Sequence, residues 1–197
     1  MALTTLSTTA RRWLTAAIGY PPAATEVMSA LGYGNFSVAA QAPDAATRTY
    51  ITGSNLAFPV GALQIGTTFR WTLNLTKTAA GSAASTFDIC FGTAGTTADT
   101  ARVSFTKPAG TAAADEGRIV IEAIVRGPLS ASGIVAGHFT MTHNLAATGH
   151  ATIPCVDVQT ISSAFNVLTP TNVGLCITSG ASDVVTIEQV VAEAWNL

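Results

Sequence analysis

The chain has little charge. Only 10% of its 197 residues are Asp, Glu, Lys or Arg, against about 25% in an average soluble domain. The net charge is −2, and the nine basic residues are scattered, with Arg11-Arg12 as their one doublet. Because such a chain has no basic field to attract phosphates, we expect no nucleic-acid partner.

Long apolar runs are also missing. Although 48% of the residues are hydrophobic, no window reaches the roughly 18 uninterrupted apolar residues that a membrane-spanning helix needs. We therefore expect no membrane partner.

Cysteine is scarce. Cys90, Cys155 and Cys176 form no CxxC motif and leave one thiol unpaired in any intrachain scheme. The simplest interpretation is buried free thiols, because a free cysteine packs as a small hydrophobe. A disulfide between subunits, made by Cys90, Cys155 or Cys176, is the alternative.

Motifs that carry catalysis or bind metals are absent. His138 and His143 are five residues apart, so on one strand they point to opposite faces, and neither they nor His150 have a Cys or carboxylate at ligand spacing. The loop from Gly92 to Thr97 lacks the lysine of a phosphate-binding loop, and we interpret it as a hairpin connection. No GxSxG occurs. We predict that the protein is not an enzyme and has no catalytic residue, cofactor or metal ion.

Paired carboxylates are the one catalytic pattern that the sequence leaves open. A glycoside hydrolase needs two acids held about 5 to 10 Å apart. The residues that could meet in space are Asp88, Asp157, Glu188 and Glu193. Asp88 lies between Phe87 and Ile89 in a strand pattern, which places it on the face opposite these aromatic and aliphatic side chains. We interpret that face as solvated or as an interface.

The clearest signal that is present is two-residue alternation of apolar and polar side chains, which is typical of half-buried strands. In residues 67–77, for example, Phe69 and Trp71 face one way and Arg70 the other. The predicted strands are 48–52, 67–77, 86–92, 102–106, 118–126, 138–144, 153–160, 163–168, 174–178 and 183–195. Because no long helical pattern lies between them, residues 35–197 are predicted to form an all-β, antiparallel, jelly-roll-like β-sandwich.

Residues 1–34 have a helical pattern that differs from the rest of the chain. They are predicted to form an anchoring arm with two short helices, near 10–18 and 26–31. Neither helix is long enough to be stable alone, so their apolar side chains must be buried on a partner or on the sandwich. The predicted anchoring residues are Arg11, Arg12, Trp13, Leu14, Ile18, Tyr20, Val27, Met28 and Leu31.

Aromatic residues on a surface would indicate sugar binding. Phe69 and Trp71 share the apolar face of their strand, and Trp195 shares parity with Val185, Ile187 and Val191, so all three are predicted to lie in the core. The candidates for an exposed sugar-binding patch are Tyr33, Tyr50 and Trp13.

Three segments of the chain resemble accessory structural proteins of tailed bacteriophage virions. They are Phe69-Arg70-Trp71-Thr72-Leu73-Asn74-Leu75-Thr76-Lys77-Thr78-Ala79-Ala80-Gly81, Phe91-Gly92-Thr93-Ala94-Gly95-Thr96-Thr97-Ala98-Asp99-Thr100 and His143-Asn144-Leu145-Ala146-Ala147-Thr148-Gly149. The resemblance covers about residues 55–197 and not the arm. It implies a structural β-sandwich, commonly a trimer on the head or tail, with no catalytic residue.

The sequence therefore predicts a non-enzymatic virion protein, placed first as a capsid decoration or head-fibre protein. The sandwich trimerises, and the arm attaches it to the major capsid protein or another virion protein. Low charge fits this role because it avoids repulsion between crowded copies. The alternative is a tail-associated, glycan-binding adhesin.

Overall fold

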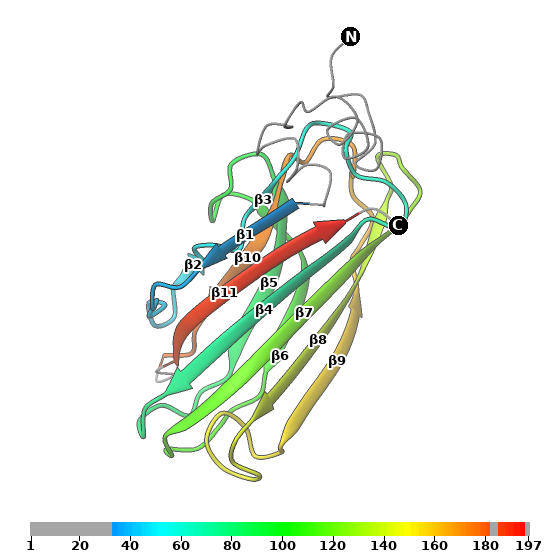
Figure 1. Cartoon of the computed structure of the whole chain (residues 1–197). Coiled ribbons are helices and arrows are strands. Elements are labelled where there is room, and N and C mark those ends of the chain that lie inside the picture. The colour runs from blue at the N-terminus through cyan, green and yellow to red at the C-terminus, as the bar shows by residue number, and fades with distance from the viewer. Residues whose placement is uncertain (1–32, 182–184, 196–197) are drawn as a thin grey trace, which may run out of the picture.

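The chain folds into two antiparallel β-sheets packed face to face, as the computed structural model shows for residues 33–181 and 185–195 (Figure 1). The predicted all-β sandwich is confirmed. The predicted arm, with its helices and all nine anchoring residues, lies outside the described residues. Within those residues, no helix is long and apolar enough to cross a membrane.

Each sheet combines strands from distant parts of the chain. The six-stranded sheet has the order β1 (Tyr33–Ser37), β11 (Val185–Trp195), β4 (Thr68–Lys77), β7 (Asp115–Gly127), β8 (Ile134–His143) and β9 (Cys155–Ile161). The five-stranded sheet has the order β2 (Arg48–Tyr50), β10 (Asn172–Thr178), β5 (Ser85–Gly92) and β6 (Thr100–Lys107), and β3 (Leu56–Ala57) also pairs with β10.

Aromatic side chains fill the space between the sheets. Phe69 and Trp71 are fully buried on β4 and stack with ring centroids 5.8 Å apart. Phe105 of β6 meets Phe139 of β8 across the core at 5.7 Å. The indole N–H of Trp71 donates to the carbonyl oxygen of Ser54 at 2.8 Å. The core position predicted for Phe69 and Trp71 is thus confirmed.

The predicted core position of Trp195 is wrong. The register of β11 against β4 shifts between Ile187 and Gln189, where one residue is inserted as a β-bulge. A one-residue insertion reverses which face every later side chain takes. Val185 and Ile187 are therefore buried, whereas Val191 and Trp195 are only partly covered.

Two further segments differ from the sequence prediction. Residues 163–168 form a loop, whose Phe165 and Val167 are buried and bond through their N–H groups to the carbonyl oxygens of Gly133 and Ser130. The alternation there reflects one-sided burial without a neighbouring strand. Tyr33, assigned to the arm by its sequence, instead begins β1 and pairs with Ala194.

Candidate functional site

The outer side of the six-stranded sheet, called here the open face, carries side chains in rows that run across the strands. Side chains at paired positions in neighbouring strands lie on the same side of a sheet. The row at one end consists of Trp195, Thr68, Ile124, Ala136 and Ile161. This apolar row is unusual for a surface, and Ile161 is 56% exposed.

The next row of the open face is charged. It consists of Glu193, Arg70, Glu122, His138 and Gln159. Arg70 Nε lies 3.4 Å from Glu122 Oε1, with both side chains nearly half exposed. His138 Nε2 contacts the Asp157 carboxylate on the neighbouring strand. Arg70 and Glu122 of this row are thus paired within the chain.

A third row mixes apolar side chains with polar ones. It consists of Phe36, Val191, Thr72, Val120, Thr140 and Asp157. Phe36, at the β1 edge, is 69% exposed. The open face therefore has a charged row between two rows that contain apolar groups.

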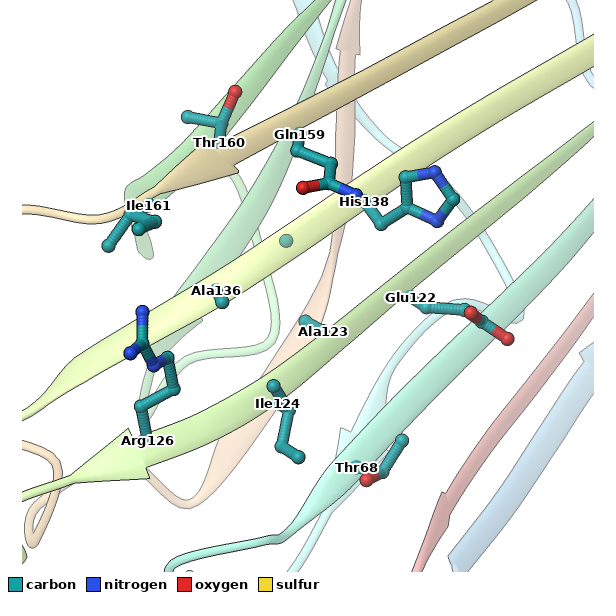
Figure 2. A pocket seen from close by; sticks show the side chains of 11 residues that line it. Thr68, Glu122, Ala123, Ile124, Arg126, Ala136, His138, Gln159, Thr160 and Ile161 are labelled. Atoms are coloured by element: carbon teal, nitrogen blue, oxygen red, sulfur yellow. The ribbon is translucent and has the colours of Figure 1, made fainter.

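A groove of about 480 Å³ lies where the apolar and charged rows meet. Figure 2 shows its side chains on β4, β7, β8 and β9, with Gln159 beside His138 and the small Ala136 between longer neighbours. The hollow forms because Ala136 is short while Arg126 and Ile161 rise beside it. The groove offers an amide, an imidazole and a carboxylate beside an apolar wall.

The outer side of the five-stranded sheet, called here the covered face, buries polar groups. Asp88 is 7% exposed on β5, where its Oδ1 accepts from Ser104 Oγ at 2.6 Å and its Oδ2 from Arg48 Nε at 3.3 Å. Arg48 Nη1 also donates to the carbonyl oxygen of Thr97 at 2.8 Å. Asp88 was expected on a solvated or an interface face, and the solvated alternative is wrong, because Arg48 reaches across the sheet and covers Asp88.

The cysteines divide into a buried pair and an exposed residue. Cys90 and Cys176 are buried free thiols on the covered face, as the simplest interpretation expected, whereas Cys155 is an exposed free thiol. For the alternative, a disulfide between subunits, Cys155 is the cysteine that lies at the surface.

A buried ion pair closes the far end of the six-stranded sheet. His143 Nδ1 lies 2.6 Å from Asp115 Oδ2, and His143 Nε2 lies 2.7 Å from the carbonyl oxygen of Ile153. Both partners are acceptors, so both contacts are hydrogen bonds only when the imidazole carries two protons. Neither side chain of the pair is accessible to solvent.

The environment of Asp115 favours its charged form. Burial acts to raise the pKa of Asp115, but hydrogen bonds from the His150 backbone N–H, the His143 side chain and the Glu116 backbone N–H outweigh it. The pKa of Asp115 is therefore lowered. The pair is a structural contact between strand ends, and its residues border hollows at this end of the open face.

The three histidines do not come together as ligands. His143 and His150 have ring centroids 6.3 Å apart, while His138 points from the open face in the charged row. Among residues 33–181 and 185–195, no cluster of three or more His, Cys, Asp or Glu side chains could hold a metal ion.

The candidate carboxylates are also separated. Asp88 belongs to the five-stranded sheet, and Asp157 and Glu193 lie on β9 and β11, four strand spacings apart. At about 4.8 Å for each spacing, these two acids are about 19 Å apart, which is too far for a hydrolase pair. Glu188 on β11 is equally remote from Asp157.

The aromatic residues expected to bind sugar do not form a shared patch. Tyr33 packs edge-to-face against Phe58 at 6.0 Å. The hydroxyl of Tyr50, in the other sheet, lies 3.1 Å from Asn55 Oδ1. Trp13 lies outside the described residues. The partly covered Trp195, in the apolar row, is the aromatic that sequence reasoning missed, because the bulge before it has no clear sequence signal.

Comparison with known proteins identifies no family. No protein-family model and no curated protein matches the chain. Among solved structures, the chain is similar to a legume lectin-like domain from Entamoeba histolytica at 8% identity, over 83% of this chain and 90% of that one, with a TM-score of 0.26.

Proposed function

We propose that the chain is a non-enzymatic structural component of a bacteriophage virion, a capsid decoration or head-fibre protein with a jelly-roll-like sandwich. The observation that carries this proposal is the open face, together with the sequence resemblance to accessory virion proteins. The sandwich assembles into a homotrimer through this face, and the arm of residues 1–34 attaches it to the particle.

The composition of the open face suits contact between copies. Exposed apolar groups are frequent at interaction surfaces, and Phe36 and Ile161, at opposite edges of the open face, are each more than half exposed. Arg70 and Glu122, which lie between them, are paired within the chain. A neighbouring copy can therefore cover these two charges at a lower cost than isolated ones.

The oligomeric state tests the assembly. We expect light scattering on the full-length chain to give a trimer, and Val120→Arg, in the middle of the open face, to give a folded monomer. Thr106→Arg is the matched control, because Thr106 is exposed on β6, in the other sheet, and should remain trimeric. A wild-type chain that is monomeric at all concentrations would contradict the trimer.

Particle association tests the virion role. Deletion of residues 1–32 leaves β1 intact, since β1 begins at Tyr33. We expect the full chain to be found by mass spectrometry in purified particles whose genome encodes it, and the shortened chain to be absent from them while its circular dichroism stays that of a β-sandwich. A full chain absent from such particles would end the proposal.

The groove favours a second candidate, a tail-associated adhesin that binds a glycan. His138, Gln159 and Glu122 can hydrogen-bond hydroxyl groups, and Trp195 lies in the adjoining apolar row. Glycan-array binding that is lost in Gln159→Ala and kept in Thr106→Ala would favour this function.

A further inference from the structure

The two buried cysteines of the covered face lie in contact although 86 positions separate them in the chain. Cys90 is on β5 and Cys176 is on β10, where Cys90 pairs with Gly174 and Cys176 with Asp88. The two thiols are thus diagonal neighbours on one side of the sheet, with their Sγ atoms 3.0 Å apart. An uninterrupted seven-residue pairing of β5 with β10 holds them at this separation.

The hydrogen bond between the two thiols gives them different pKa values. Arg48 Nη2 donates to Cys90 Sγ at 3.0 Å. The hydrogen bond between the thiols lowers the pKa of Cys176 and raises that of Cys90. Burial raises the pKa of both thiols, and the Arg48 charge acts in the opposite direction. Of the two thiols, Cys176 therefore has the lower pKa.

The cover over the thiols is thin at one edge. Arg48, with 30% of its side chain exposed, and Tyr50 both belong to β2, a three-residue strand at the edge of the sheet that pairs only with β10 among the described strands. Short edge strands open locally at a lower cost in free energy than the strands at the centre of a sheet. A small molecule can therefore reach the sulfur atoms without global unfolding.

We propose that Cys90 and Cys176 are a redox-active pair that a small-molecule disulfide, such as oxidised glutathione, converts into an intrachain disulfide between β5 and β10. This modification site is independent of the proposed virion function.

The exchange takes place in two steps. The Cys176 thiolate attacks one sulfur of glutathione disulfide, whose S–S bond breaks, and the released glutathione thiolate takes up a proton. Cys90 then loses its proton to solvent and attacks Cys176 Sγ in the mixed disulfide, which expels the second glutathione. The two protein thiols are oxidised, and one glutathione disulfide is reduced to two glutathione molecules.

Arg48 assists the second step. Once Cys176 is in the mixed disulfide, Cys90 loses its thiol partner but keeps the guanidinium 3.0 Å away. A nearby positive charge stabilises the thiolate form of a cysteine. The resulting bond closes a long loop, so we expect the melting temperature to rise by roughly 5 to 10 °C on oxidation.

The test uses full-length Cys155→Ser, which removes the exposed thiol and leaves the pair untouched. The variant is incubated with oxidised glutathione, unfolded, alkylated and weighed by mass spectrometry. We expect no alkylation, a mass lower by two hydrogen atoms, and a cross-linked peptide that contains Cys90 and Cys176. Dithiothreitol should restore two alkylatable thiols and the lower melting temperature.

Two further variants in the Cys155→Ser background test whether both thiols are needed. With Cys90→Ser or Cys176→Ser, the remaining thiol should stop at the mixed disulfide with glutathione, because no second thiol is present to close the bond. Circular dichroism checks that both remain folded.

The wild-type chain supplies the internal reference, because exposed Cys155 reports that the oxidant is active. Two alkylatable thiols persisting in Cys155→Ser, after Cys155 of the wild type is fully glutathionylated, would overturn the proposal. So would glutathione that stays on Cys90 or Cys176 in Cys155→Ser without closing the bond.

Discussion

The strands of both sheets alternate apolar and polar residues, but the two outer faces of the sandwich differ in how far their polar side chains are exposed to solvent. On the open face, Arg70 and Glu122 form an ion pair with nearly half of each side chain in solvent. On the covered face, Asp88 forms the equivalent pair with Arg48, but only 10% of its side chain is exposed. The difference arises because β2 supplies two long side chains, Arg48 and Tyr50, that lie over β5 and β10.

Side chains that cover a polar strand face, as Arg48 and Tyr50 do, change the chemistry of that face. The ion pairs and hydroxyls of the open face are screened by water, so they contribute little to stability and are free to meet a partner. The covered face places a carboxylate, a guanidinium and two thiols in a protected cluster, where hydrogen bonds shift the pKa values of the thiols. The first face suits assembly, and the second suits chemistry within the chain.

The largest effect is expected for Asp115→Asn, which changes the buried contact between His143 and Asp115 at one end of the six-stranded sheet. Asn has only one acceptor oxygen, so its amide NH₂ group would face the N–H donor of Glu116, or those of His143 and His150. We expect the free energy of unfolding to fall by about 3 kcal/mol, measured by urea denaturation at neutral pH. Glu116→Gln, at an exposed neighbouring position, is the control and should change stability by less than about 0.5 kcal/mol.

The same pair makes stability depend on pH. Because the pKa of Asp115 is lowered in the folded chain, its contribution is complete above the unfolded value of about 3.9. This contribution is lost as the pH falls through the lower folded value. Urea denaturation between about pH 5 and about pH 2 should show a steeper loss for the wild type than for Asp115→Asn. Equal slopes would mean that the carboxyl is not held in its charged form.

Asp88→Ala tests the covered face directly. It removes the acceptor of both Ser104 and Arg48, and the effect is limited because Arg48 can turn its partly exposed side chain toward water. We expect a loss of about 1.5 to 2 kcal/mol, measured by urea denaturation. A loss below about 0.5 kcal/mol would mean that the covered face is as solvated as the open one.

The sequence could predict the strands but not what covers them. The alternation around Trp71 predicted 67–77, and the structure has β4 at Thr68–Lys77, because burial on one face dictates the pattern locally. The bulge that turns Trp195 outward adds one residue without a sequence signal. Arg48 lies 40 positions from Asp88, so only the three-dimensional pairing of β2 could reveal that Asp88 is buried and that the two thiols meet.

Gly174→Ala should weaken the cover by a smaller amount. A Cβ atom at position 174 would lie 2.0 Å from the hydroxyl oxygen of Tyr50, so the ring must move and its hydrogen bond to Asn55 is lost. We expect a loss of about 1 kcal/mol and faster reaction of Cys176 with an aromatic disulfide reagent. In Gly34→Ala the nearest atom is 3.7 Å away, so this control should leave thiol reactivity unchanged.

The smallest effect is expected for the ion pair of the open face. A double-mutant cycle of Arg70→Ala and Glu122→Ala should give a coupling of about 0.3 kcal/mol in dilute solution, because both side chains are screened by water, and about 1 M salt should abolish it.

The proposed assembly predicts that the coupling between Arg70 and Glu122 changes with chain concentration. Once a neighbouring copy covers the face, the same pair becomes desolvated, and each single substitution should shift the assembly equilibrium by more than about 1 kcal/mol. A coupling that stays small at every concentration, in a chain that does form trimers, would place the trimer contact on another surface of the sandwich.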